Sequence, residues 1–208
     1  MTKRIMIAAL AAGVAPSPAL AQSAAPVIVA PIATAPKDDL VRVRITTSAG
    51  PIVVALDRGR APLSVANFLA YVDRKAFDGE AFYRAMPYGA GGLIQGGVTS
   101  DARKLRKAVA HEPTSKTGLK NIAGALVMAR LQPGSAQSDF FILTTDIAQF
   151  DASAADPGFA VFGRVTEGMD VVAKIFAAPR SATKGAGVMK GQMLEPPVRI
   201  VKATRLPK

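Results

Sequence analysis

Short segments with the residue pattern of β-strands outnumber helical segments in this chain by about eight to two. In residues 41–46, for example, apolar and polar side chains alternate, which is typical of a strand with one buried face. Because the helical segments do not alternate with the strands, the order excludes a parallel βαβ sheet and predicts a closed antiparallel barrel. The predicted strands are residues 41–46, 52–56, 81–86, 93–95, 122–129, 140–144, 159–165 and 198–203.

Two segments have apolar residues at helical spacing. The first follows Pro62, a residue that is tolerated in the first turn of a helix, and continues to Val72. The second is expected to open at Thr166 and Glu167 and to end near Phe176. Each segment has one apolar face, so we expect both helices to cover the barrel.

The N-terminus has the order of a secretory signal peptide. A basic start (residues 1–4) precedes an apolar run (5–14) and the small-residue motif Ala19-Leu20-Ala21. The run is about half of the ~20 residues that a membrane span requires. We therefore expect a signal peptide over residues 1–21, periplasmic localisation and no membrane attachment after cleavage. An Ala/Pro-rich tether (22–38) would then precede the folded domain (39–208).

Composition excludes several kinds of site. The chain has no cysteine, so it has no disulfide, thiolate nucleophile or zinc ribbon. Its single histidine, His111, excludes a His-cluster metal site, and no serine lies in a nucleophile elbow that could pair with it. We therefore expect no metal site, and no cofactor is expected either.

The formal net charge of +11 raises the possibility of a nucleic-acid partner. The basic residues are scattered, however, and the one compact run, residues 103–107, has no aromatic residues interleaved with it. We interpret this run as a solvated loop and expect no nucleic-acid partner.

Five short strings carry a more specific signal. Read in order, they closely resemble the cyclophilin family of peptidyl-prolyl cis-trans isomerases, and the resemblance spans residues 41–205. It implies an eight-stranded antiparallel barrel capped by two helices, in agreement with the strand pattern, and proline-containing polypeptides as substrates. The strings are FYRAMP (82–87), IQGG (94–97), ALVMAR (125–130), SDFFI (138–142) and AVFGRV (160–165).

The resemblance assigns the catalytic roles to Arg84 and Gln95. Amide resonance gives Xaa-Pro rotation a barrier of roughly 20 kcal/mol. A donor that hydrogen-bonds the prolyl nitrogen favours the twisted transition state, in which that resonance is lost. Arg84 matches the family's arginine in this role. Gln95 matches the glutamine that contacts the substrate backbone and holds the arginine.

The remaining site residues are assigned to substrate binding. Phe141 matches the aromatic floor of the slot for the proline ring, and further positions line that slot. Others match the strand along which the substrate chain lies. The slot residues are Leu93, Phe150 and Phe159, and the strand residues are Met128, Ala129 and Arg130. Asp139 is also assigned to substrate binding by its position.

Two departures from the family pattern leave a second hypothesis open. Asp139 stands where the family has a substrate-reading glutamine, and its carboxylate would pair with Arg84 and draw donors away from the prolyl nitrogen. Gly92 falls at the position of a pocket phenylalanine, in a longer segment, residues 88–94. The chain is therefore expected to be either a monomeric isomerase acting on exported proteins or a proline-binding module with weak or no turnover.

Overall fold

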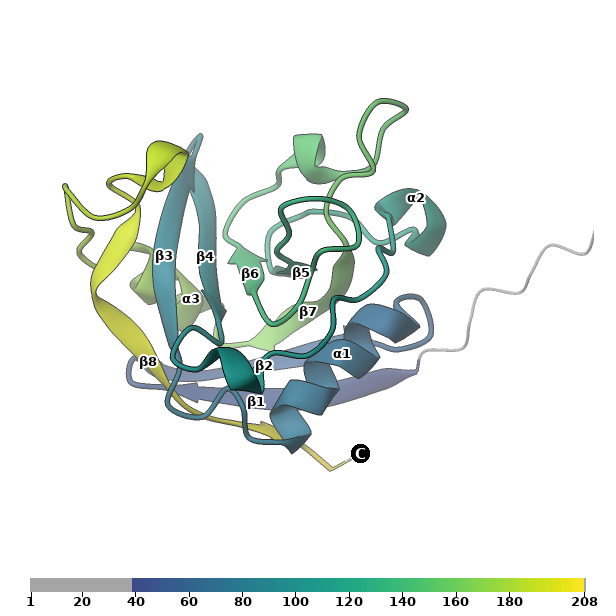
Figure 1. The fold of residues 1–208 in the computed structure, drawn as a ribbon, viewed down its shortest axis with the longest axis horizontal. Coiled ribbons are helices and arrows are strands. Elements are labelled where there is room, and N and C mark those ends of the chain that lie inside the picture. The colour runs from purple at the N-terminus through teal and green to yellow at the C-terminus, as the bar shows by residue number, and fades with distance from the viewer. Residues whose placement is uncertain (1–38, 208) are drawn as a thin grey trace, which may run out of the picture. The chain divides into compact units, whose positions relative to one another are not determined.

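Eight antiparallel strands form a closed barrel, as predicted, in the order β1-β2-β7-β5-β6-β4-β3-β8 (Figure 1). The computed structural model describes residues 39–207, so the predicted signal peptide (1–21) and tether (22–38) lie outside the described residues. The strands are β1 (Leu40–Thr47), β2 (Gly50–Asp57), β3 (Ala81–Tyr88), β4 (Gly91–Gly97), β5 (Ala125–Met128), β6 (Phe140–Leu143), β7 (Val161–Glu167) and β8 (Met193–Arg205).

The two predicted helices are present, together with a shorter third. They are α1 (Pro62–Asp73) and α3 (Met169–Phe176), whereas the unpredicted α2 (Thr114–Thr117) is a single turn, too short to show helical periodicity. Short 3-10 segments are η1 (Ala102–Lys104), η2 (Ala148–Phe150) and η3 (Gly187–Met189). Within residues 39–207, no helix is both long enough and apolar enough to cross a membrane.

The predicted start of the second helix was wrong. Thr166 and Glu167 are the last residues of β7, and α3 begins only after Gly168. Gly168 has a φ of 88°, and a Cβ there would lie 2.4 Å from the carbonyl oxygen of Pro51. This glycine therefore turns the chain between strand and helix at a point where a side chain does not fit.

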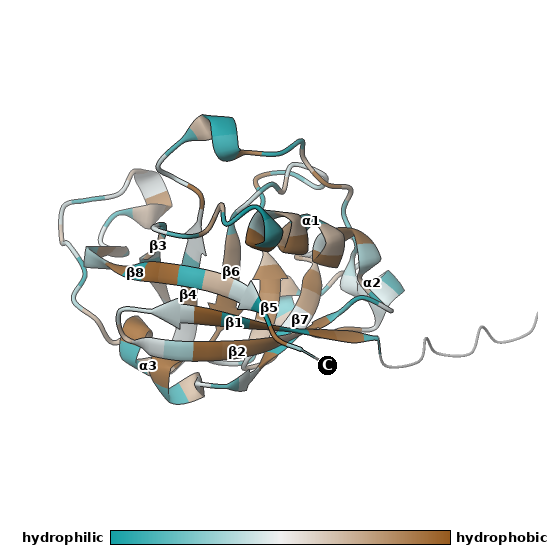
Figure 2. Cartoon of the chain, turned by 90° about the horizontal axis from the view of Figure 1, so that it is seen from below, coloured by the Kyte–Doolittle hydropathy of each residue, from teal (hydrophilic) through white to brown (hydrophobic). Residues whose placement is uncertain are grey.

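Alternate residues of the strands point into the barrel interior, and side chains of the helices pack against them. Hydrophobic residues recur along the strands (Figure 2), and Ile94 and Phe140 point inward. Helix α1 packs against β2, β7 and β8, and α3 packs against β2, β3 and β4. The ring of Phe68 in α1 lies 5.2 Å from that of Phe140 and 5.4 Å from that of Phe162. The barrel is therefore a packed core.

Strands β4 to β7 are apolar on their outer face as well. Leu93 and Phe141, the neighbours of the inward residues Ile94 and Phe140, belong to a second buried cluster outside the barrel. Because side chains alternate along a strand, the same short apolar runs supply both layers. The outer cluster forms the base on which the candidate site is built.

Candidate active site

An open cavity of about 670 Å³ lies over the outer face of β3, β4 and β6. The structure brings every predicted site residue except Met128 into its lining. The predicted residues that line it are Arg84, Leu93, Gln95, Ala129, Arg130, Asp139, Phe141, Phe150 and Phe159.

Arg84 and Gln95 face each other across the β3–β4 hairpin. The longer segment noted in the sequence, residues 88–94, contains a tight turn at Gly89 and Ala90, and both strands extend up to that turn. The pairing register shifts between Phe82 and Arg84, so Tyr83 is the extra residue of a β-bulge. A bulge changes which way the following side chain points. Here it allows Tyr83 and Arg84 to reach Gln95 on the same outer face.

The guanidinium of Arg84 is held by two amide oxygens. Its Nη1 donates to Oε1 of Gln95 at 2.8 Å, and its Nε and Nη2 both donate to Oε1 of Gln192, at 2.8 and 2.7 Å. These bonds leave one N–H on each terminal nitrogen without a partner among the described residues. Burial lowers the pKa of Arg84, but a guanidinium stays charged at neutral pH.

Gln192 is a site residue that the sequence did not reveal. It lies in the segment between α3 and β8, which runs beside the β3–β4 hairpin in Figure 1. Its backbone carbonyl accepts a hydrogen bond from the N–H of Ala85 at 2.9 Å, and its side-chain Nε2 donates to the carbonyl of Val188 at 2.8 Å. Only the pairing of β3 with β8 brings Gln192 to Arg84, and no local motif signals it.

The predicted pairing of Asp139 with Arg84 was wrong. Asp139 Oδ2 accepts instead from the hydroxyl of Tyr83 at 2.6 Å and from Nε2 of Gln95 at 3.5 Å. Gln95 Nε2 also donates to the Tyr83 hydroxyl oxygen at 2.7 Å. Burial raises the pKa of Tyr83, and the neighbouring Asp139 carboxylate raises it further, so the hydroxyl keeps its proton. The carboxylate thus leaves the Arg84 donors free.

Three phenylalanines form an apolar slot beside Arg84. The ring of Phe141 meets those of Phe150 and Phe159 edge to face, with centroids 5.9 and 5.5 Å apart. Phe150 and Phe159 lie 4.7 Å apart and are joined by a backbone hydrogen bond of 2.8 Å. The amide of Asn121 donates to both of their carbonyls, at 3.0 and 3.4 Å. Hydrogen bonds and ring contacts therefore hold the slot in a fixed shape.

The departure at Gly92 is explained by the backbone. Gly92 has a φ of 153°, and a Cβ there would lie 1.9 Å from the carbonyl oxygen of Met86. No other residue fits at this position. The side chain of Met86 lines the cavity nearby and supplies apolar surface in place of the expected phenylalanine. Tyr88 is exposed at the end of β3 and does not line the cavity.

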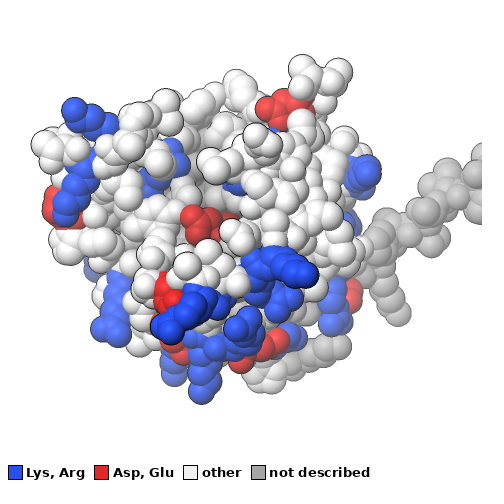
Figure 3. Space-filling view, in the orientation of Figure 1, with Lys and Arg blue, Asp and Glu red and all other residues white. Residues whose placement is uncertain are grey.

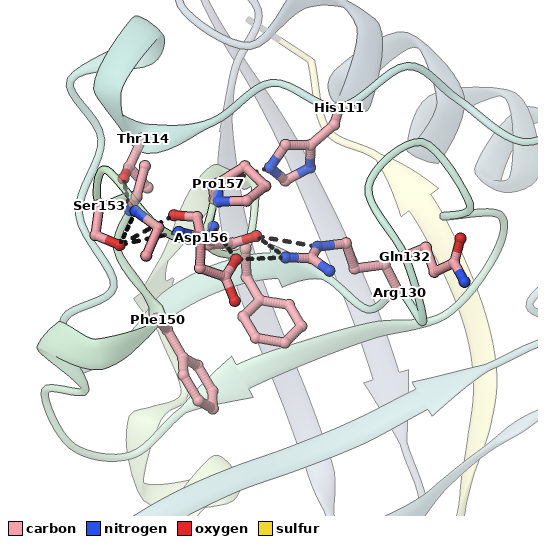
Figure 4. A network of polar contacts seen from close by, with 12 residues as sticks. His111, Thr114, Arg130, Gln132, Phe150, Ser153, Asp156 and Pro157 are labelled. Atoms are coloured by element: carbon pink, nitrogen blue, oxygen red, sulfur yellow. Dashed lines mark hydrogen bonds and ion pairs between the residues drawn. The ribbon is translucent and has the colours of Figure 1, made fainter.

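The side chain of Arg130 braces the slot, a role that the sequence did not indicate. Its guanidinium points at the loop that leads to Phe159 (Figure 4), donating to the carbonyl of Gly158 at 2.6 Å and to Asp156 at 3.0 Å. It also lies over the Phe159 ring, 4.9 Å from the centroid. The Arg130 side chain is only 8% exposed, so these contacts fix both the loop and the ring.

Met128 belongs to the strand on which the substrate is predicted to lie, but its side chain does not line the cavity. It is buried in the barrel core, because alternation along β5 turns it inward and leaves Ala129 to line the cavity. Its backbone N–H is also engaged, donating to the carbonyl of Ala160 at 2.9 Å.

The basic run at residues 103–107 is solvated in part, because Arg103, Arg106 and Lys107 are exposed. Lys104 pairs with the buried Glu80 at 3.0 Å, and Leu105 lines the cavity. Figure 3 shows Lys and Arg side chains gathered along the lower edge of the face that carries the site.

In residues 39–207, no group of three or more His, Cys, Asp or Glu side chains could hold a metal ion.

Comparisons with known proteins agree with this geometry. The family model described as "Cyclophilin type peptidyl-prolyl cis-trans isomerase/CLD" matches residues 42–205. The chain is 42% identical to peptidyl-prolyl cis-trans isomerase A of Dickeya dadantii over 135 residues, covering 64% of this chain and 70% of that protein. It is 38% identical to a peptidyl-prolyl cis-trans isomerase of Acinetobacter baylyi over 161 residues, covering 76% and 82%.

A solved structure has the same fold. The crystal structure of a cyclophilin-type isomerase of Cryptosporidium parvum superposes with a TM-score of 0.66 at 21% identity, covering 81% of this chain and 99% of that one. A second structure of the C. parvum protein, in the presence of the dipeptide Ala-Pro, gives a TM-score of 0.65.

Proposed function

Because the chain belongs to the cyclophilin-type peptidyl-prolyl cis-trans isomerase family, we propose that it accelerates Xaa-Pro rotation in exported polypeptides as they fold. The observation that carries the proposal is the position of Arg84. Its guanidinium is held by Gln95 and Gln192 at a cavity that the apolar slot of Phe141, Phe150 and Phe159 also lines. A proline ring suits such a slot, and its amide bond would then lie beside a charged donor.

The reaction requires only that the twisted amide be stabilised more than the planar one. As the bond twists, the prolyl nitrogen becomes pyramidal and gains a lone pair that can accept a hydrogen bond. Arg84 has free N–H groups on both terminal nitrogens to donate to it. Because Gln95 and Gln192 hold the guanidinium in place beforehand, little reorganisation is needed as the charge develops. Binding that strengthens only in the transition state lowers the barrier.

The slot contributes in a different way. Its apolar walls are built on buried residues, so a bound proline leaves water and the local dielectric falls. A hydrogen bond from Arg84 is stronger in such surroundings than in bulk water. The slot therefore selects proline and increases the effect of the arginine.

The alternative is a proline-binding module without turnover, which was favoured by the departures at Asp139 and Gly92. The contacts of these two residues no longer favour it. Asp139 bonds to Tyr83 and leaves Arg84 free, and Met86 lines the cavity near Gly92. An exchange measurement on an Xaa-Pro peptide, by NMR or by protease coupling, separates the two hypotheses. We expect catalytic amounts of the protein to accelerate exchange, whereas binding without acceleration would support the alternative.

The proposal includes the setting in which the enzyme works. The basic start, apolar run and Ala19-Leu20-Ala21 motif support export and a periplasmic location. The proposal also takes the enzyme to be a monomer that acts on proline-containing polypeptides. On this proposal the enzyme needs neither nucleic acid nor a membrane.

A further inference from the structure

We propose that Tyr83 and Asp139 are positioning residues: together they fix the direction of the Gln95 side-chain amide and, through it, the orientation of Arg84. The inference rests on the proposed isomerase activity. It gives Asp139 a role other than the substrate binding that the resemblance implied for it.

The direction of the Gln95 amide decides whether it can hold Arg84. A glutamine amide presents an acceptor at one end and donors at the other. Here Oε1 faces Arg84 and accepts from Nη1 at 2.8 Å, while Nε2 faces away. If the amide were reversed, its NH₂ would face the guanidinium, two donors would meet, and the bond would be lost.

The groups behind Gln95 permit only this direction. An ionised carboxylate can accept hydrogen bonds but cannot donate them. The Tyr83 hydroxyl must therefore donate its hydrogen bond to Asp139, at 2.6 Å, which leaves its oxygen as the acceptor for Gln95. Gln95 meets that oxygen at 2.7 Å and the carboxylate at 3.5 Å, so both neighbours require its NH₂ end. The direction of every bond in the chain of contacts is set by Asp139.

Asp139 is itself held firmly. Its Oδ1 accepts from the hydroxyl of Ser138 at 3.1 Å. It also packs closely on the backbone of Gly97, where an added Cβ would lie 2.1 Å from Oδ1. No ion pair joins Asp139 to Arg84 within residues 39–207, so it acts on the arginine only through Tyr83 and Gln95. The β-bulge that brings Tyr83 and Arg84 to the same face makes this arrangement possible.

The test separates turnover from binding. NMR exchange at saturating Xaa-Pro peptide gives kcat, and a titration gives the peptide Kd. We expect Tyr83→Phe, which removes the hydroxyl, to lower kcat by about five- to tenfold, the scale of one or two lost hydrogen bonds. The peptide Kd should stay within about twofold, because the slot is intact. Tyr88→Phe is the matched control, since Tyr88 lies on the same strand and its hydroxyl bonds to no described residue.

Asp139 variants test the same chain of contacts from its other end. Asp139→Ala should lower kcat as Tyr83→Phe does, and the double variant should lose no more than the worse single one, because both break one network. Asp139→Asn, which retains an acceptor for Tyr83, should recover part of the loss. The side-chain NMR signals of Gln95 and Arg84 should move in Tyr83→Phe and stay unchanged in Tyr88→Phe.

Three outcomes would overturn the inference. They are an unchanged kcat in Tyr83→Phe, a weaker Kd with kcat retained, which would mean direct contact with substrate, and losses that multiply in the double variant. If Asp139→Ala does not fold, Tyr83→Phe decides alone. A wild-type protein without isomerase activity would refute the proposed function instead, and the side-chain signals would still report on the network.

Discussion

Gln192 fixes the half of the Arg84 guanidinium that Gln95 does not reach. One amide oxygen accepts from both Nε and Nη2, so rotation of the guanidinium would break two hydrogen bonds at once. The remaining N–H groups are thereby aimed in a constant direction. Preorganisation of this kind is what makes an electrostatic donor effective in catalysis.

We therefore expect Gln192→Ala to lower kcat by about five- to tenfold, the scale of losing hydrogen bonds to a charged group. The fold should be unaffected, because the backbone carbonyl that bonds to Ala85 remains. Gln132→Ala, which removes an exposed glutamine side chain from another loop, is the control. Retention of full kcat in Gln192→Ala would show that Gln95 alone positions the arginine.

The sequence identified the residues that lie within continuous strings and missed those that join the site from elsewhere. Arg84, Gln95 and Phe141 each belong to a string, so their roles could be predicted. Gln192 lies 108 residues from Arg84 and depends on strand pairing that no local pattern reveals. The partner of Asp139 could not be predicted either, because the bulge at Tyr83 is visible only in the pairing register.

At the scale of elements, Glu80 anchors the segment that forms one wall of the cavity. Glu80 is 3% exposed, and its carboxylate accepts from the backbone N–H groups of Thr99 and Ser100, at 3.0 and 3.1 Å. The Ser100 hydroxyl and Lys104 also donate to it. Burial alone would raise the pKa of Glu80, but the hydrogen bonds from these donors outweigh burial. The pKa of Glu80 is therefore lower than its ordinary value of 4.5.

This shift predicts how stability depends on pH. A carboxylate whose pKa is lower in the folded state stabilises the fold above its unfolded pKa and loses that effect as pH falls through the folded value. Glu80→Gln should therefore reduce the free energy of unfolding by ~1–3 kcal/mol at pH 7. The difference from wild type should shrink once the pH falls below 4.5.

Urea unfolding at pH 7 and at acidic pH measures both quantities. Glu167→Gln is the control, since Glu167 forms an exposed ion pair with Arg42 and exposed pairs contribute little. If the difference in the free energy of unfolding between wild type and Glu80→Gln persists at acidic pH, the segment is held by the packing of the Glu80 side chain and not by its charge.

Strands were easier to predict than their ends. Apolar runs identified all eight, but β8 begins at Met193 and not near residue 198, and β5 is shorter than predicted. The first half of β8, residues 193–198, lacks the alternating pattern of a strand, because two prolines interrupt it and only Leu194 among its side chains is buried. The single-turn helix α2 gave no signal because four residues are too few to show helical periodicity.

At the scale of the whole molecule, the barrel gives the site its rigidity. Strands β4 to β7 supply the barrel core from one face and the base of the slot from the other. The site therefore sits on elements that are already fixed by packing, which suits a reaction that depends on orientation rather than on covalent chemistry.

Export also belongs to this scale. We expect the mature protein to begin at Gln22, because Ala19-Leu20-Ala21 has the small residues that signal peptidase requires. Intact-mass analysis of protein from a periplasmic fraction measures the N-terminus directly. A product that retains Met1 and stays with the membrane would contradict this expectation.

The most direct test of the account is the isomerase rate of Arg84→Ala beside wild type, measured by NMR exchange on one Xaa-Pro peptide. The account predicts a loss of about 100-fold or more in kcat/KM, the scale typical of removing a key electrostatic donor. Folding should be retained, because Arg84 lies at the cavity and not in the barrel core. A well-folded Arg84→Ala protein with the wild-type rate would contradict the account.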